Sequence, residues 1–242
     1  MGPSDKLLQF VTTSAVRTGL LEAIAAGQRT TDVFLGHLDV STSAVYDALG
    51  DLEERGLVLE RDGTYYLTGS GQVIVDLLDE LDRVESVLDG IGDYLATHDT
   101  SVLPRDWRVR LGELEGASII TATETQPQLA VTAVVERMAA ADTACVISPI
   151  YTESYADTMP DAEGSKLLLD AEIMRSTVGD GVPDMEADPY DDVDIRIDDV
   201  DFALPVTEDE LMLSLPRLHG EYDTRTELVA PRDDARQCGL HR

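Results

Sequence analysis

The chain has 242 residues, enough for two small domains or one of medium size. Hydrophobic residues make up 43% of it, which excludes a disordered tail even though the formal net charge is −30. No apolar run approaches the roughly 18 residues of a membrane span, and the first residues lack the basic and apolar regions of a signal peptide. We therefore expect a soluble, cytoplasmic protein without a membrane partner.

The charge comes from 48 acidic residues set against 18 basic ones, spread along the whole chain. A surface rich in carboxylates stays hydrated in concentrated salt, where the Debye length falls to about 3 Å and self-repulsion is largely screened. We interpret the acid excess as adaptation to high salt. The alternative is one unusually acidic protein from an ordinary cytosol.

Three helices are predicted before Gly56. Apolar residues at helical spacing predict one helix over residues 5–26, and a second, short helix is expected to begin near Thr31. Ser41 is expected to cap a third helix, whose apolar residues recur at i, i+4 and i+7 until Gly56 ends it.

Two short β-prone runs follow on either side of Asp62-Gly63, a strong signal for a tight hairpin. Three helices and a hairpin in this order are typical of a winged helix-turn-helix domain, which we place at residues 1–68. The stretch VSTSAVYDALGDLEERGLVLERDGTYYLT (residues 40–68) resembles winged-helix regulators of bacteria and archaea in its Ser/Thr-rich start, Leu-x-x-Leu core, Arg-Gly-Leu-Val segment and glycine-containing wing. The resemblance implies a transcriptional regulator that binds double-stranded DNA sequence-specifically.

In such a domain the start of the third helix enters the major groove, where small hydroxyl groups bond base edges or phosphates. Ser41 is expected to act mainly as the N-cap, which leaves Thr42, Ser43 and Tyr46 to read bases. The basic residues available for phosphate contact are few: Arg17, Arg29, Arg55 and Arg61. The predicted DNA-binding set is Thr31, Ser41, Thr42, Ser43, Tyr46, Arg55 and Arg61.

The local charge opposes this function. Residues 1–65 hold five basic and ten acidic residues, a net charge of −5, whereas phosphate neutralisation normally supplies much of the affinity for DNA. Hydrogen bonds, helix N-termini and DNA shape would then carry recognition. The alternative function stays open: a protein-interaction module whose degenerate winged helix does not bind DNA.

Residues 69–97 predict one long helix with an apolar seam. The seam residues are separated by alternating steps of three and four, a strict a/d pattern over three heptads. Such a seam favours a homodimer over the alternative, a helix that lies on its own domain, and we assign residues 69–98 to a connecting and dimerisation helix. The predicted dimer contacts are Ile74, Leu77, Leu81, Val84, Leu88, Ile91 and Leu95.

Beyond residue 98 short strands alternate with helices, which predicts an α/β sandwich-like domain over residues 99–242. Continuous apolar strands indicate a mixed sheet covered on both faces. With its N-terminal helices, the chain falls in the α+β or α/β class. Strands are expected at 117–121, 143–150, 165–170, 193–197, 200–206 and 210–216, and a helix at 127–141.

The end of the chain carries a second resemblance. ELMLSLPRLHGEYDTRTELVAPRDDAR (210–236) resembles the end of the sensor domain in archaeal winged-helix regulators of the methanogenesis-regulator type, and residues 103–121 and 145–157 resemble earlier parts of it. The resemblance implies a domain that senses a small-molecule effector. Since α/β folds bind ligands at the ends of buried strands, we expect a pocket there, although for each single residue a structural role, such as a turn hydrogen bond in GEYDTR, is favoured over ligand contact. The predicted lining residues are Ser148, Tyr151, His219, Tyr222, Asp223 and Arg225.

Enzymatic motifs are missing from the sequence. It contains no GxSxG, HExxH, P-loop or GxGxxG pattern, and none of its four histidines stands at metal-ligand spacing from another donor. We therefore predict no enzyme activity, no catalytic residue, no metal and no cofactor. The predicted function is a homodimeric transcriptional regulator with an effector-sensing domain.

Overall fold

The computed structural model describes residues 6–150, 157–172 and 193–232. The chain divides into two compact units, Met1–Asp82 and Arg83–Arg242. The dividing point falls inside a single helix, α5 (Gly69–Leu95), and not at the predicted boundaries after residues 68 and 98. Each half of α5 packs into the core of its own unit, so this helix is not a separate segment.

Two helices replace the single one predicted at residues 5–26. α1 (Leu7–Thr12) has Thr13 as its C-cap, and α2 (Ala15–Ala25) begins after Ser14, whose extended backbone interrupts the helix. The Ser14 hydroxyl accepts a hydrogen bond from the Arg17 backbone N–H at 3.4 Å. The apolar periodicity runs through this break, so the prediction of one helix is wrong where a serine side chain competes for a backbone hydrogen bond.

The rest of the N-terminal unit agrees with the prediction. α3 (Thr31–His37) and α4 (Thr42–Glu54) are the second and third helices. β1 (Val58–Arg61) and β2 (Thr64–Leu67) pair antiparallel. Asp62 and Gly63 between them have φ values of 52° and 76°, and two positive values are the signature of a type I′ turn. The second and third predicted helices and the hairpin wing are therefore confirmed.

The core of this unit gathers its four helices, the wing and the first turns of α5. Leu20 and Phe34 are fully buried in it, and Ile74 of α5 packs into the same cluster. Gly71 allows the close approach of α5, because a Cβ atom there would lie 2.0 Å from the Leu57 carbonyl oxygen. Any larger residue would force α5 away from the start of the wing.

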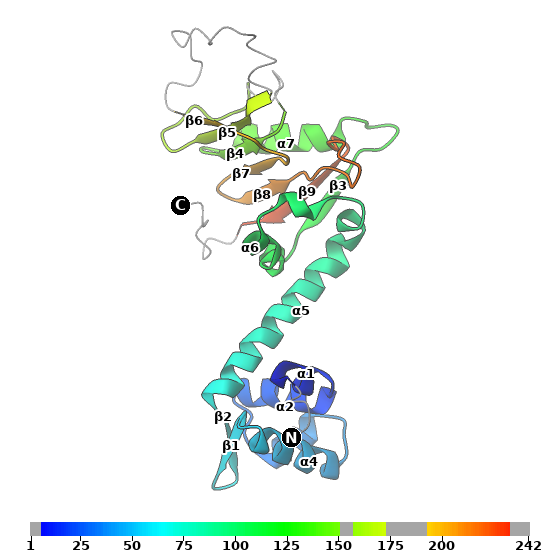
Figure 1. Cartoon of the computed structure of the whole chain (residues 1–242), viewed down its shortest axis with the longest axis vertical. Coiled ribbons are helices and arrows are strands. Elements are labelled where there is room, and N and C mark those ends of the chain that lie inside the picture. Colours follow the sequence, from blue (N-terminus) through cyan, green and yellow to red (C-terminus); the bar gives the residue numbers. More distant parts are fainter. Residues whose placement is uncertain (1–5, 151–156, 173–192, 233–242) are drawn as a thin grey trace. The chain divides into compact units, whose positions relative to one another are not determined.

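Among the described residues, the C-terminal unit forms a seven-stranded sheet in the order β3-β9-β8-β7-β4-β5-β6 (Figure 1). β4, β5 and β6 run parallel and the other neighbours antiparallel, so the sheet is mixed, as predicted. The residue pattern did not predict β9, which lies inside the sheet. The strands are β3 (Ser118–Thr121), β4 (Cys145–Ser148), β5 (Lys166–Asp170), β6 (Asp194–Asp198), β7 (Leu204–Val206), β8 (Glu210–Leu213) and β9 (Thr226–Pro231).

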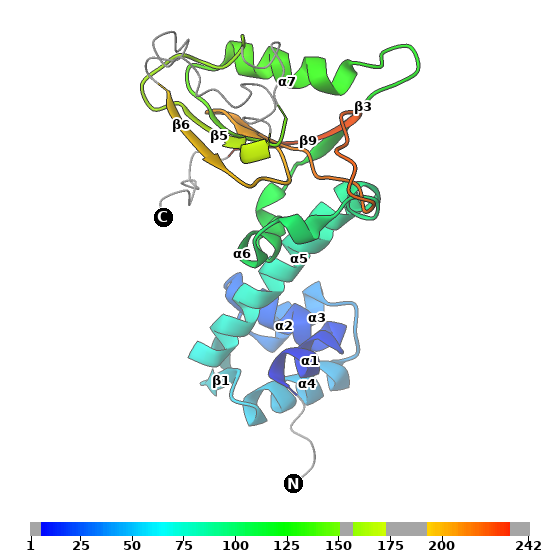
Figure 2. The same ribbon diagram turned by 45° about the horizontal axis from the view of Figure 1, so that its top comes forward.

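Helices cover both faces of this sheet (Figure 2). On one face, α7 (Leu129–Ala140) packs Met138 against Met212 and Val229. On the other face, the end of α5 and the residues around α6 (Arg105–Arg108) pack against Leu228. Neighbouring residues of β9 therefore enter different cores, as the alternation of a strand requires. Two 3₁₀ turns, η1 (Thr100–Val102) and η2 (Leu111–Leu114), flank α6.

α5 extends over 27 residues, of which seven are acidic and one is basic. Its length alone would suffice to cross a bilayer, but its charges would not allow it. Across the described ranges, no helix combines the length and apolarity that crossing a membrane requires.

Candidate functional site

The start of α4 presents a cluster of exposed polar side chains. Ser41 Oγ accepts a hydrogen bond from the Ala44 backbone N–H at 3.3 Å, so Ser41 is the N-cap. Thr42 and Ser43 are exposed in the first turn, and Tyr46, one turn later, leaves 53% of its surface exposed. Residues three and four apart lie on the same side of a helix. The structure therefore brings four residues of the predicted DNA-binding set together.

Two other members of that set lie apart from this cluster. Thr31 is the first residue of α3 and is half-buried. Arg55 follows the last residue of α4, about 20 Å from its start at a rise of about 1.5 Å per residue. The Arg55 guanidinium lies 4.2 Å from the centre of the Phe10 ring, and the Arg17 guanidinium lies 3.9 Å from the same centre. Both cations thus pack on Phe10 at the far end of α4.

Acidic residues beside the wing serve as acceptors for its backbone. Glu53 Oε1 accepts a hydrogen bond from the Glu60 N–H at 3.0 Å and so links α4 to β1. Glu60 Oε1 accepts one from the Gly63 N–H at 2.6 Å and so closes the type I′ turn. Arg61, the last residue of β1, is exposed. Part of the acidity that opposes DNA binding therefore has a structural use in fixing the wing.

Only the centre of the predicted seam of α5 is open. Three seam residues lie in protein cores and are not available to a partner, because each compact unit takes them into its own interior: Ile74, Ile91 and Leu95. The four residues between them form the exposed stripe of α5: Leu77 and Leu81 (each 45% exposed), Val84 (half-buried) and Leu88 (43% exposed).

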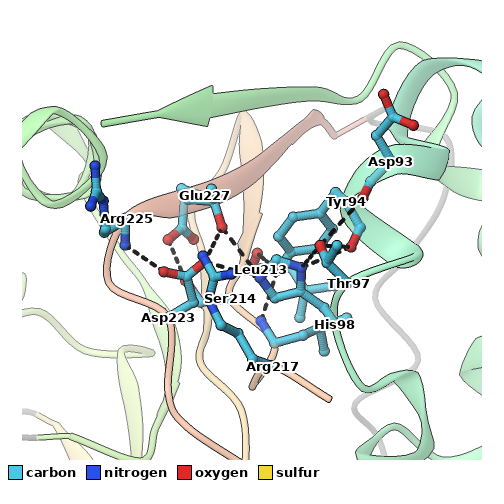
Figure 3. A network of polar contacts seen from close by, with 12 residues as sticks. Asp93, Tyr94, Thr97, His98, Leu213, Ser214, Arg217, Asp223, Arg225 and Glu227 are labelled. Carbon is cyan, nitrogen blue, oxygen red and sulfur yellow. Dashed lines mark hydrogen bonds and ion pairs between the residues drawn. The ribbon is translucent and has the colours of Figure 1, made fainter. Parts of the chain in front are cut away.

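A buried polar network joins the end of α5 to the connection between β8 and β9 (Figure 3). His98 Nε2 lies 3.1 Å from Asp223 Oδ2, and both side chains are buried. Arg217 and Thr226 donate hydrogen bonds to the same carboxylate oxygen at 2.9 and 2.8 Å. The Arg225 backbone N–H donates to the other oxygen at 2.9 Å. Asp223 is thus occupied by protein partners on both oxygens.

This network keeps Asp223 ionised. Burial, the largest single influence, raises the pKa of Asp223. The hydrogen bonds that its carboxylate accepts, together with the positive charge of Arg217, outweigh burial and hold the pKa of Asp223 below its usual value.

Tyr94 extends the network into α5. Its ring stacks on the His98 ring with the ring centres 3.9 Å apart. The Tyr94 hydroxyl accepts a hydrogen bond from the Leu215 N–H at 2.8 Å and donates one to the Leu213 carbonyl oxygen at 3.4 Å. Burial raises the pKa of this hydroxyl, which therefore stays neutral and can both donate and accept. The last turn of α5 is in this way bonded to the end of β8.

Glu227 lies on the opposite face of β9 from Thr226, as strand alternation requires. The Ser214 hydroxyl donates a hydrogen bond to Glu227 Oε2. Glu227 Oε1 is buried and has no hydrogen-bond partner among the described residues. Burial raises the pKa of Glu227 to about 7, although the Ser214 hydrogen bond and the charge of Arg137 act to lower it.

The six residues predicted to line a ligand pocket do not converge. Tyr151 lies outside the described residues. Ser148 ends β4, and its hydroxyl donates to the Ile150 carbonyl oxygen at 2.6 Å. The β8–β9 connection reaches the same edge of the sheet but lies three strands from Ser148, about 14 Å at the usual strand spacing. It carries the other four residues: His219, Tyr222, Asp223 and Arg225.

Residues 5–89 match a haloarchaeal family model described as the HVO_A0261 N-terminal domain. The match ends within α5. Among curated proteins, none matches the chain in sequence. One similar solved structure is that of TrmBL2, described as an archaeal chromatin protein with a novel mode of DNA binding. The two chains share 12% identity over 93% of this chain and 91% of that one, with a TM-score of 0.35.

Proposed function

We propose that the protein is a transcriptional regulator that binds double-stranded DNA as a homodimer. The observation that carries this proposal is the exposed start of α4, where Thr42, Ser43 and Tyr46 stand clear of the core. In winged helix-turn-helix domains the start of the recognition helix, which corresponds to α4 in this chain, enters the major groove. Two hydroxyl groups and one phenol there supply donors and acceptors for base edges.

The negative charge of the N-terminal unit does not prevent this function in concentrated salt. Counterion release contributes little to DNA affinity at high salt, whatever the charge of the protein. The N-terminus of α4 offers backbone N–H groups and a partial positive charge to a phosphate. Recognition then depends on hydrogen bonds at close range, and the start of α4 has the groups to form them.

The occupant of the exposed stripe of α5 is a second copy of this chain. Leu77, Leu81, Val84 and Leu88 follow one another in steps of four, three and four, so they lie on one side of the helix. An a/d pattern matches itself across a two-fold axis. Each aliphatic side chain that becomes fully buried contributes about 1.5–3 kcal/mol before entropy costs. The two-fold axis predicts a palindromic operator.

For the C-terminal unit, the proposed role is to hold the end of α5 through His98 and Asp223. The small-molecule effector implied by the sequence resemblance would act on the β8–β9 connection. That connection carries Tyr222 and Arg225 on either side of the Asp223 anchor. A ligand that moved this connection would alter the support of α5.

The test is enrichment of bound duplexes from a random-sequence pool in molar KCl, followed by affinity measurements on the enriched sequence. Wild-type protein should select a two-fold-symmetric motif. Thr42→Ala, Ser43→Ala and Tyr46→Ala should each relax the preference at individual base pairs, since a good base contact is worth about 1–3 kcal/mol. Thr132→Ala, which removes an exposed hydroxyl from α7, is the matched control. A folded protein that enriches no duplex would favour the interaction module instead.

A further inference from the structure

Arg29 lies in the connection between α2 and α3, against the wing. Its carbonyl oxygen accepts a hydrogen bond from the Tyr65 N–H at 2.9 Å, so this connection runs along the free edge of β2. Its guanidinium lies 4.8 Å from the centre of the Tyr66 ring, within the range of a cation–π interaction. Arg29 is nevertheless exposed. The wing therefore fixes the position of this cation without covering it.

The strand register places Arg29 and Arg61 on the same face of the wing. Tyr66 stands opposite Leu59 in the hairpin, and Arg61 lies two residues beyond Leu59, so Tyr66 and Arg61 share one face. The other face of the hairpin is turned to the core, where the centre of the Tyr65 ring lies 6.0 Å from that of the Phe34 ring. Glu60 alternates to that core-facing side. The outer face of the hairpin thus carries two guanidinium groups and no strand carboxylate.

These two arginines also differ from the other arginines of the N-terminal unit. Arg17 pairs with Asp51 at 3.6 Å and packs on Phe10, as Arg55 does. Arg29 and Arg61 form no ion pair with any residue that the structure describes. Residues 1–65 contain ten acids and five bases, and in such surroundings a cation kept apart from carboxylates retains its full attraction for an outside anion.

We propose that Arg29, held on Tyr66, binds a backbone phosphate of DNA and forms with Arg61 a phosphate-binding face on the wing. This inference rests on the proposed DNA binding and adds a contact that the start of α4 does not supply. The N–H groups of a guanidinium lie in its plane, so packing on a ring leaves them free to bond two phosphate oxygens. Because Tyr66 already orders the side chain, less conformational entropy is lost on binding.

The experiment measures the affinity of the full chain for the enriched duplex and for an unrelated duplex at several KCl concentrations. Arg29→Ala should weaken binding to both duplexes by the same factor, and the slope of log affinity against log salt should become shallower by about one. Tyr66→Leu keeps the charge and loses the ring, so it should weaken binding with an unchanged slope. Arg105→Ala, which removes an exposed arginine from α6, is the control for net charge.

Methylphosphonate substitution of the duplex identifies the phosphate. At one position per half-site, the neutral linkage should weaken binding of the wild type and leave binding of Arg29→Ala unchanged. Thermal unfolding of each variant establishes that the fold is intact. Affinity and salt slope of Arg29→Ala equal to those of Arg105→Ala would overturn the inference and leave the proposed function standing. Absence of binding by wild-type protein would overturn both.

Discussion

His98 and Asp223 are 125 positions apart in the chain, yet His98 Nε2 lies 3.1 Å from Asp223 Oδ2 in the interior of the C-terminal unit. The second ring nitrogen of His98, Nδ1, lies 2.7 Å from the Tyr94 carbonyl oxygen. Thr97 Oγ1 lies 3.1 Å from the same nitrogen. The His98 ring thus bridges the backbone of the last turn of α5 and the Asp223 carboxylate, and it fixes that turn to the β8–β9 connection.

Removal of this carboxylate should loosen the C-terminal unit. Asp223→Ala leaves His98 and Arg217 without their shared acceptor, and a buried polar group that loses its hydrogen-bond partner costs about 1–3 kcal/mol. Trp107, the single tryptophan, lies in this unit with its ring centre 6.1 Å from that of Phe202. Its fluorescence during urea unfolding in high salt therefore measures the free energy of unfolding of this unit.

The control for Asp223→Ala is Asp89→Ala, which removes an exposed acid from α5 and should change little. The effect should also depend on pH. The folded-state pKa of Asp223 lies below its ordinary value of 3.8. The contribution of Asp223 to the free energy of unfolding is therefore fully present above pH 3.8 and is lost as the pH falls below 3.8. Equal stability of the two variants at neutral pH would contradict the role given to Asp223.

Glu227 should produce the opposite pH dependence. Its folded-state pKa is about 7 against an ordinary 4.5, so between these values the native state holds a proton that the unfolded state releases. Stability therefore falls as the pH rises through this window. Glu227→Gln should remove the slope and stabilise the protein above it by up to about 3 kcal/mol. Urea unfolding across the window measures this, with the exposed Glu221→Gln as control. Parallel profiles for wild type and Glu227→Gln would refute it.

The exposed stripe of α5 should hold the homodimer together. Leu81→Asp combined with Leu88→Asp places charges at two of the four residues of this stripe and should give monomers in sedimentation experiments in molar KCl. Val109→Asp combined with Leu218→Asp makes the same change at residues 53% and 59% exposed outside α5, and should leave the dimer intact. Dimerisation should tighten as KCl rises, because α5 has seven acids and one base. Wild-type monomers at every KCl concentration would rule out this dimer.

Replacement by alanine should have opposite effects on stability at two glycines of α5. Gly71→Ala brings a Cβ to 2.0 Å from a backbone oxygen that cannot turn aside, and should destabilise the N-terminal unit by about 1–3 kcal/mol despite better helix propensity. Gly92→Ala meets no atom within 4 Å and should stabilise α5 by about 1 kcal/mol. Thermal melts followed by circular dichroism distinguish them. Equal midpoints for the two variants would mean that the contact with Leu57 is absent.

Structures set by neighbouring residues could be predicted from the sequence. The Ser41 cap and the Asp62-Gly63 turn depend on side chains within one turn of chain, and both are present. The dividing point inside α5 and the shortened exposed stripe could not be predicted, since a periodic pattern does not reveal which apolar residues another element will cover. β9 could not be predicted for the same reason, because its interior position depends on pairing with β3 and β8, which no local pattern reveals.

The candidate sites divide in the same way. The start of α4 follows from the helix cap that precedes it. His98 carries no periodic signal, and its partner is distant in sequence, so nothing local marked it as the anchor of α5. For Asp223 within GEYDTR, the sequence favours a structural role such as a turn hydrogen bond over ligand contact. The structure agrees with that role, since both of its oxygens are bonded to protein.

The interior position of β9 also fixes an order of events during synthesis. The buried core of the N-terminal unit ends at Leu78, so all of it leaves the ribosome long before Thr226. β3 begins at Ser118 but must wait for β9 to pair with it, and His98 must wait for Asp223. A nascent chain therefore has every residue of the winged helix-turn-helix while the far end of α5 is still without an anchor. A chain truncated before Thr226 would therefore contain the whole core of the N-terminal unit but lack β9, the partner of β3.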